Sequence, residues 1–232
     1  MATREYNLSG FSRINIRFAM EAEIIQSEQF KVTVSGSDSL LDNANVYVEG
    51  DRLVVGYHLN FISFITAPFS HGIVTIHMPY IRELQITGAA RCYLKGFDSD
   101  KEFELHVSGA SQVDFTDFAA GNMRWELSGA SQIRGQIKLS EDADIRASGA
   151  SHISLKGSVR DISLDAAGAS QIDLRDFVTR NAKIRLSGAS HYHLNMNGRL
   201  DVDLSGASTL EYEGNVTMGD VRVSGGSNLR KR

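Results

Sequence analysis

Apolar and polar residues alternate along most of this chain, and from residue 81 onward the alternation recurs with a period of about twenty residues. Each period carries a motif of small residues that reads Ser-Gly-Ala-Ser in most of its eight copies. The glycines of these copies are Gly88, Gly109, Gly129, Gly149, Gly168, Gly188, Gly206 and Gly225. An internal period of this length is typical of a solenoid, in which each repeat stacks on its neighbours.

Three columns of the aligned repeats are apolar in every copy. Four residues before the glycine stand Leu84, Leu105, Trp125, Ile145, Leu164, Ile184, Val202 and Val221. Two residues before it stand Ile86, Val107, Leu127, Ala147, Ala166, Leu186, Leu204 and Val223. Four residues after it stand Cys92, Val113, Ile133, Ile153, Ile172, Tyr192, Leu210 and Leu229. Stacked repeats bring each column together, so we expect the three columns to form the core.

The Gly-Ala pair predicts a tight corner between two strands, with a variable return loop completing each coil. Glycine suits this corner because it adopts a positive φ and permits the close approach of another backbone. We interpret the serines as structural, because a catalytic serine would occur once and not in nearly every repeat. The repeats therefore predict an all-β protein, a parallel β-helix or solenoid with about 20 residues per coil.

One polar column shows an alternation of charge. Three residues before the glycine stand Gln85, His106, Glu126, Arg146, Asp165, Arg185, Asp203 and Arg222, and the sign alternates from Glu126 onward. Parallel, in-register stacking would place each of these residues beside its equivalent in the next coil, so alternation makes opposite charges neighbours. We interpret this column as a charge ladder on a solvent-exposed face. Such a ladder is only weak evidence for a binding site.

Residues 1–80 lack the repeat but have the pattern of strands. Ile14, Ile16 and Phe18 alternate with polar residues, and a hairpin is predicted where residues 46–48 and 53–55 flank a turn. Residues 39–44 are compatible with one helical turn. We expect the segment 1–80 to pack on or continue the first coil, and residues 81–232 to form the repeat solenoid, within one continuous domain.

The segment 59–69 is the most apolar part of the chain and fits neither a strand pattern nor the repeat. One interpretation is a strand and loop that cover the first coil. The alternative is an exposed apolar loop, with Phe61, Phe64 and Phe69 available to a ligand, a partner or a second copy of the chain.

Composition excludes several classes of protein. The formal net charge of −4 gives no basic surplus for nucleic acid. The single cysteine, Cys92, rules out an internal disulfide and falls in an apolar column, so we expect a buried thiol. The chain has no run of eighteen apolar residues, so no transmembrane helix is predicted. The first residues do not resemble a secretory signal, which leaves a cytoplasmic protein or a chain given without its export signal.

Several local motifs resemble one known family. They are Phe11-x-x-Ile14-x-Ile16, Leu40-Leu41-Asp42, His77-Met78-Pro79-Tyr80-Ile81 and the recurring Ser-Gly-Ala-Ser-x-Ile-x-Leu. Together they resemble the "putative auto-transporter adhesin, head GIN domain" family over nearly the whole chain. The resemblance implies a right-handed parallel β-helix, export to the periplasm or cell surface of Bacteroidetes-type bacteria, and no established activity. The chain departs from the family in its missing signal sequence and in the segment Phe61–Phe69.

Carboxylates need inspection because parallel β-helices include polysaccharide-degrading enzymes, which use two converging acidic groups. The candidates are Asp114 with Asp117 and Asp173 with Asp176, three coils apart. Arg134, His193 and Glu211 occupy the same column and make it another ladder of mixed charge. We therefore predict no catalytic residue and no cofactor, with a pectinase-like enzyme as the alternative.

A strip of amides and imidazoles follows the corners. Three residues after the glycine stand Gln112, Gln132, His152, Gln171 and His191. We expect these side chains to hydrogen-bond along the rod, and they are the best candidates for binding a carbohydrate or another protein. His191 and His193 lie on one face and would form at most a weak metal site, so no metal site is predicted.

Three functions remain open at this stage. The first is a non-enzymatic, exported protein that acts as an adhesin or binds surface glycans. The second is the pectinase-like enzyme. The third is a structural module that self-assembles into a homo-oligomer through the segment Phe61–Phe69 or through its terminal coils.

Overall fold

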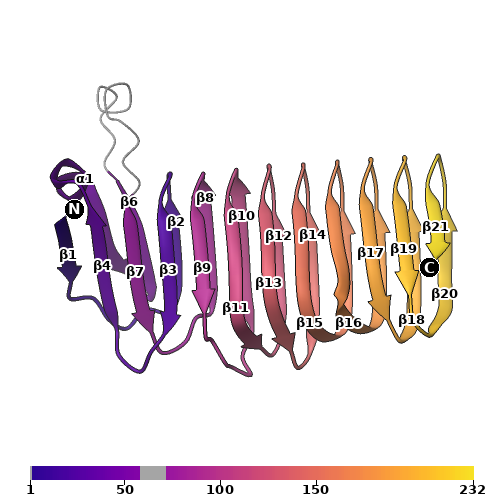
Figure 1. Ribbon diagram of the computed structural model, residues 1–232, viewed down its shortest axis with the longest axis horizontal. Helices are drawn as coiled ribbons and strands as arrows, with labels where there is room; N and C mark the ends of the chain where they lie inside the picture. Colours follow the sequence, from indigo (N-terminus) through magenta and orange to yellow (C-terminus); the bar gives the residue numbers. More distant parts are fainter. Residues whose placement is uncertain (1, 58–71) are drawn as a thin grey trace.

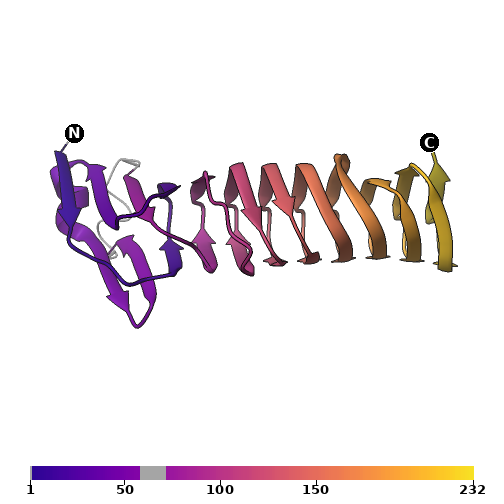
Figure 2. The ribbon, with the colours of Figure 1, turned by 90° about the horizontal axis from the view of Figure 1, so that it is seen from below.

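The computed structural model describes residues 2–57 and 72–232, which form a rod of stacked β-coils with roughly 20 residues per turn (Figure 1). The N-terminus lies near one end of the rod and the C-terminus at the other. Figure 2 shows the coils in single file, with the N-terminal strands spread over a broader area. The predicted all-β solenoid is confirmed.

Each coil contributes one strand to each of two faces. Face A holds the strands that precede the corners, and its spatial order is β5 (Ala44–Glu49), β6 (Arg52–Tyr57), β2 (Arg13–Arg17), β8 (Glu83–Gly88), β10 (Phe103–Gly109), β12 (Met123–Leu127), β14 (Asp142–Ala147), the second halves of β15 (His152–Ala166) and β16 (Gln171–Leu186), β18 (Gly198–Leu204) and β20 (Val216–Val223). Strands from β6 onward are parallel, whereas β5 pairs with β6 antiparallel.

Face B holds the strands that follow the corners. Its order is β1 (Ala2–Tyr6), β4 (Lys31–Gly36), β7 (Ile73–Met78), β3 (Glu21–Gln26), β9 (Arg91–Lys95), β11 (Gln112–Ala120), β13 (Gln132–Leu139), the first halves of β15 and β16, β17 (His191–Met196), β19 (Thr209–Glu213) and β21 (Asn228–Lys231). In Figure 1 the coils advance from left to right, and the chain runs downward along face B, which is nearer the viewer, and upward along face A behind it. The coil is therefore right-handed.

The apolar columns stack in register and form the core, as predicted. Leu105 pairs with Trp125 and Trp125 with Ile145, and all three side chains are buried. Aromatic rings pack together within the core, with Phe115 stacked on Trp125 at a centroid distance of 5.8 Å. Cys92 is fully buried, and this burial raises the pKa of its thiol, so the residue is part of the core and not a reactive group.

The corners are held together by backbone hydrogen bonds from coil to coil. The amide of Ala150 donates to the carbonyl of Gly129 at 2.9 Å, and the amide of His152 donates to the carbonyl of Ser131 at 2.8 Å. Every corner glycine from Gly88 to Gly225 has a positive φ, as predicted. In the six corners from Ser111 to Ser208 the last serine is buried, and in most of them its hydroxyl donates to the carbonyl three residues earlier, as Ser131 does to Ser128 at 3.1 Å.

Stacking continues through the N-terminal residues. Strand β2 lies between β6 and β8, and β3 lies between β7 and β9, so residues 13–26 form a coil in register with the repeats. Arg17 pairs with Thr87, which places Phe18 where the next coil has Gly88. Phe18 has the positive φ of that corner, 73°, and is 41% exposed. Its assignment to the strand with Ile14 and Ile16 was therefore wrong.

Two other N-terminal predictions are confirmed. The predicted helical turn is α1 (Asp38–Asn43), whose N-cap Ser37 accepts a hydrogen bond from the amide of Leu40 at 3.3 Å. The predicted hairpin is β5–β6, closed at Glu49 and Arg52. The segment 59–69, predicted either to cover the first coil or to form an exposed apolar loop, lies outside the described residues.

The coil at the C-terminal end keeps the register but not the burial. Val221 and Val223 pair with Val202 and Leu204 of the preceding coil. Val221 and Val223 are 44% and 45% exposed, whereas Val202 and Leu204 are 3% and 0% exposed. The difference follows from stacking, because a coil buries its apolar columns only when it has a neighbour on each side.

We predict that Gly149→Ala destabilises the fold strongly. A Cβ at this position would lie 2.5 Å from the carbonyl oxygen of Gly129, and φ is +88°. Gly50→Ala is the matched control, because φ is +62° there but nothing lies within 4 Å of the added Cβ. The control should lose only the ~1–2 kcal/mol of an unfavourable backbone conformation. Denaturant unfolding measures both, and equal losses would contradict a steric role for the corner.

We predict that Tyr192→Phe stabilises the protein. The Tyr192 side chain is fully buried, and its hydroxyl has no hydrogen-bond partner among the described residues. Removing a buried, unsatisfied hydroxyl should raise the free energy of unfolding by about 1 kcal/mol. Tyr80→Phe serves as the control, since Tyr80 is 39% exposed and its hydroxyl group reaches water. A loss of stability in Tyr192→Phe would show that the hydroxyl has a favourable partner.

Candidate functional site

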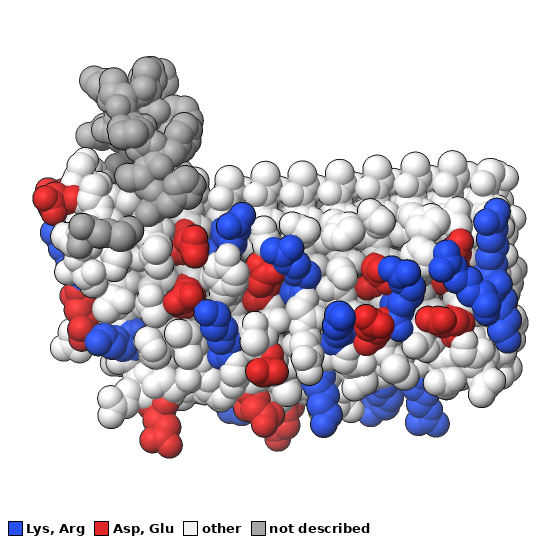
Figure 3. Space-filling view, viewed as in Figure 1, with Lys and Arg blue, Asp and Glu red and all other residues white. Residues whose placement is uncertain are grey.

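The predicted amide and imidazole strip is a continuous row on face B. Gln112, Gln132, His152, Gln171 and His191 pair in sequence across adjacent strands. The row continues with Thr209 and Asn228, so it carries no Lys, Arg, Asp or Glu beyond β9. Figure 3 shows this uncharged band next to the corners, with the charged side chains farther down the same face.

The hydrogen bonds of the strip run differently from the prediction. The side chain of Gln112 donates sideways to Asp114 of its own strand at 2.7 Å, and His191 contacts His193 of its own strand. These five residues make no side-chain hydrogen bond to one another, so the expected ladder along the rod was wrong. Gln112 bonds sideways because the carboxylate of Asp114, two residues away, is a stronger partner than the neighbouring amide. The other candidates, Phe61, Phe64 and Phe69, lie outside the described residues.

A second polar column runs beside the strip. It contains Asp114, Arg134, Ser154, Asp173, His193, Glu211 and Arg230 in register. Asp114 accepts a hydrogen bond from Arg134 of the next coil. Asp173 accepts two from Arg175 of its own strand, at 2.9 and 2.5 Å. Most of this column is therefore neutralised by local ion pairs.

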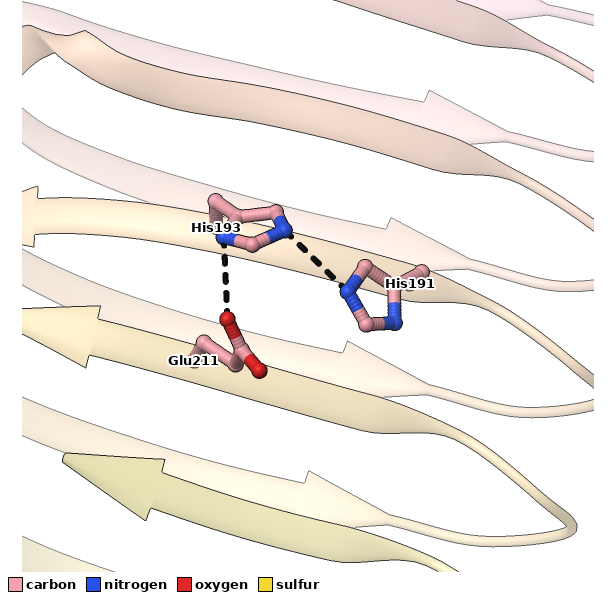
Figure 4. A group of neighbouring side chains, drawn as sticks. All are labelled: His191, His193 and Glu211. Carbon is pink, nitrogen blue, oxygen red and sulfur yellow. Dashed lines mark hydrogen bonds and ion pairs between the residues drawn. The ribbon is translucent and has the colours of Figure 1, made fainter. Parts of the chain in front are cut away.

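A cluster of two histidines and a glutamate lies where the strip and this column meet. His191 and His193 lie on the same face of β17, and Glu211 follows on β19 (Figure 4). The two Nε2 atoms are 3.1 Å apart, and His193 Nδ1 is 3.2 Å from Glu211 Oε2. One donor atom from each residue lies within 4.8 Å of the others. The prediction gave His191 and His193 at most a weak site and did not include Glu211.

The cluster is poorly hydrated. The side chains of His193 and Glu211 are only 14% and 10% exposed. Burial lowers the pKa of His193, and the carboxylate of Glu211 opposes that shift. His193 Nδ1 and Glu211 Oε2 are buried and close but not aligned for a hydrogen bond, so Nδ1 has no hydrogen-bond partner, whereas Oε2 forms an ion pair with Arg232 Nε at 2.5 Å. A signal for Glu211 was available, because it occupies the same position after its glycine as His193 does.

Two long, open grooves follow the rod on face A. The first, here called the corner groove, has a volume of about 560 Å³ and runs between the corners and the charge ladder. Its polar lining is Gln85, Thr87, His106, Ser108, Glu126, Ser128, Arg146, Ser148 and Asp165. Because these residues come from five successive coils, the groove repeats similar groups at every coil, about every 4.8 Å.

The second groove, here called the return-loop groove, lies at the other end of the same strands. Its volume is about 420 Å³. Its polar lining is Glu102, Asn122, Arg124, Asp142, Asp144, Asp161, Ser163, Asn181, Lys183, Arg199 and Asp201. Both grooves are open along their length, which suits an extended ligand better than a compact one.

The charge ladder of face A has the predicted register, with Glu126, Arg146 and Asp165 side by side. Within it, only His106 and Glu126 approach within 4 Å, at 3.3 Å. Arg146 contacts Asp144 of its own strand at 3.7 Å instead. The charged groups of the ladder are therefore only partly neutralised, and they line the corner groove. The sequence interpretation did not predict this groove.

A family model for "putative auto-transporter adhesin, head GIN domain" matches residues 10–216. The chain belongs to this family. The resemblance read from the repeats and the N-terminal motifs is thereby confirmed. A search of curated proteins found no match for this chain.

Solved structures of similar proteins share the fold of this head GIN domain. A "putative lipid binding protein" from Parabacteroides distasonis is 20% identical, with a TM-score of 0.78 and coverage of 99% of this chain and 96% of the other. A "putative adhesin" from Parabacteroides merdae is 14% identical, with a TM-score of 0.80 and coverage of 100% and 95%. One from Bacteroides fragilis is 16% identical, with a TM-score of 0.70 and coverage of 100% and 96%. At these identities the likeness extends to the fold alone.

Three of the four carboxylates considered as catalytic candidates, Asp114, Asp173 and Asp176, form ion pairs. Asp176 lies 3.3 Å from Lys156, and Asp114 pairs with Arg134. Hydrogen bonds from Arg175 lower the pKa of Asp173. A general acid needs the opposite shift, towards neutral pH. As for the membrane, the described residues include no helix long and apolar enough to cross it.

We predict a pH-dependent contribution from Asp201 in the return-loop groove. Hydrogen bonds from Arg199, and one from the Asp220 amide, lower the pKa of Asp201. The ionised group therefore stabilises the fold above its unfolded pKa of about 3.9, and this contribution disappears as the pH falls through the lower folded pKa.

Wild type should therefore be more stable than Asp201→Asn at about pH 5–7, and the two should converge below about pH 4. Asp203→Asn is the control, because Asp203 makes no ion pair within the described residues. Chemical unfolding at several pH values measures the difference. A gap that persists at acid pH would contradict a role for the ionised carboxylate.

Proposed function

We propose that this chain is a non-enzymatic, exported binding protein of the adhesin type, which holds a linear surface carbohydrate in the corner groove. The observation that supports this most is the groove itself, which spans five coils and presents similar polar groups once per coil. A polymer of repeating sugar units has a matching linear periodicity, whereas a small molecule would fill only a fraction of the groove.

The groups in the corner groove suit a ligand rich in hydroxyls. Ser128 and Ser148 supply hydroxyls along one wall, and Glu126, Arg146 and Asp165 supply charged acceptors and donors along the other. Asp165 has no ion pair among the described residues, so its carboxylate is free to accept hydrogen bonds. Hydrogen bonds to charged groups contribute about 1.5–3 kcal/mol each, which makes this wall the stronger source of affinity.

The ion-paired carboxylates support binding over hydrolysis. Glycoside hydrolysis requires one carboxylic acid with a raised pKa beside a second carboxylate. Arginine side chains instead lower the pKa of both Asp173 and Asp201. One relative is named as a lipid-binding protein, but here the core between the two faces is filled by packed aliphatic and aromatic side chains. Export to the cell surface is supported by the adhesin family alone.

The predicted strip on face B remains the competing location for the same function. Its amides and imidazoles are also suited to hydroxyl recognition, but they lie on a face without the corner groove. Paired variants on the two faces distinguish the two locations, because the stacked core is common to both.

We predict that Glu126→Gln combined with Arg146→Gln weakens polysaccharide binding at least about tenfold, through the loss of charged hydrogen-bonding groups. The matched control on face B is Gln132→Ala combined with Gln171→Ala, which should bind like wild type. A glycan array identifies the ligand, and calorimetry with that glycan measures the affinities. Reducing-end release from the same polysaccharides is measured in parallel.

Three outcomes would contradict the proposal. Loss of binding in the face B pair alone would place the site on the strip. Release of reducing ends by wild type would show an enzyme. Binding to no glycan on the array would remove the carbohydrate as the ligand. Fractionation of cells that produce the protein from its native gene tests export separately, since recovery in the cytosol would contradict it.

A further inference from the structure

Hydrogen bonding in the His191–His193–Glu211 cluster leaves one buried ring nitrogen without a partner. The two Nε2 atoms share a hydrogen bond at 3.1 Å, whereas His193 Nδ1 lies 3.2 Å from Glu211 Oε2 without an aligned bond, and that oxygen is also 2.5 Å from Arg232 Nε. Buried polar atoms without partners are uncommon in native structures, and a bound ion is one explanation for them. The cluster is remote from the corner groove, because it lies on face B.

We propose that His191 and His193 chelate one divalent transition-metal ion through their Nε2 atoms, with Glu211 positioning His193. Imidazole is a preferred ligand of Cu²⁺, Ni²⁺ and Zn²⁺, and the usual order of affinity favours Cu²⁺. The donor set lacks the several oxygen ligands that Ca²⁺ and Mg²⁺ require.

The separation of the two nitrogens fits a shared ion. Two Nε2 atoms 3.1 Å apart, each bonded to a metal at about 2.0–2.1 Å, subtend an angle of about 100° at the ion. That angle lies between those of square-planar and tetrahedral sites. The β-strand produces this spacing, because residues two apart point to the same side of the sheet. The ion would displace the proton that one of the two nitrogens otherwise holds between them.

Glu211 supplies the second half of the site. A metal-bound histidine usually donates its other ring N–H to a carboxylate, which fixes the tautomer and the orientation of the ring. Glu211 is placed for this role by the register of the solenoid, since it pairs directly with His193 across β17 and β19. In the metal-bound chain we expect the ring of His193 to turn until Nδ1–H donates to Oε2. Arg232 Nε lies 2.5 Å from the same oxygen and holds the carboxylate in place (Figure 4 shows the cluster without it).

The strip contains its own control for this site. His152 occupies the same row as His191, but the residue two positions later is Ser154 and not a second imidazole. A single imidazole of this kind cannot chelate. Binding that depends on His191 and His193 but not on His152 would therefore identify the pair.

The test is calorimetric titration of the tag-free, chelator-treated chain with Cu²⁺, Ni²⁺ and Zn²⁺. We expect one Cu²⁺ per wild-type chain, and loss of that binding in His191→Gln and in His193→Gln. Glu211→Gln should lower the affinity about 10–100-fold, the usual effect of removing a carboxylate that orients a ligand. His152→Gln should bind like wild type. Circular dichroism confirms that each variant is folded.

Electron paramagnetic resonance of the Cu²⁺-loaded wild type gives a readout that does not depend on any variant. Two coordinated imidazole nitrogens would produce the corresponding hyperfine pattern and support the site. A signal without two nitrogens, absence of stoichiometric binding, or an equal loss in His152→Gln would overturn the proposal. An unchanged affinity in Glu211→Gln would overturn the role of the carboxylate.

Discussion

The structure depends on the backbone hydrogen bonds that join each corner to the corner before it. From Ala110 to Gly226, the amide of the residue after each corner glycine donates to the glycine carbonyl of the previous coil, at 2.7–2.9 Å. That contact requires two backbones to approach closely with φ positive, which only glycine does without strain. An alanine in the same place would put its Cβ against the carbonyl oxygen that accepts the bond. The small corner residues are thus fixed by the stacking itself.

Because the corners and the inward columns hold the fold, the outward columns are free to differ. The column of Trp125 and Ile145 is apolar in every repeat, whereas the charge ladder beside it changes sign from coil to coil. Relatives only 14% and 20% identical keep the same fold, with TM-scores of 0.80 and 0.78. A shared fold at such identities says little about a shared ligand. Function must be argued from the outward-facing side chains of each chain.

The sequence predicted those parts of the fold that recur. Eight aligned glycines define the register, so the strip from Gln112 to His191 was placed correctly. The segment 1–80 was expected to pack on or continue the first coil, and β2 and β3 do continue it. Their corner was not recognised because Phe18 stands there instead of glycine, and a single unusual copy leaves no period to detect. The register alone did not predict which side chains contact one another. Column neighbours lie about 4.8 Å apart, and whether a long side chain bonds along the rod or sideways depends on rotamers and competing partners.

Because the coils stack in register, side chains on this fold meet in two directions, along a strand and between neighbouring coils. Residues two apart on a strand and residues one coil apart form a grid on each face, with both spacings close to the reach of a side chain. His191 and His193 meet along the strand, and His193 and Glu211 meet across the coil. Neither pair alone specifies a site, since most such pairs here are simple ion pairs such as Arg175 with Asp173. On face B, His191, His193 and Glu211 combine both directions in one cluster, and we place the proposed metal site there, with Glu211 also held by Arg232.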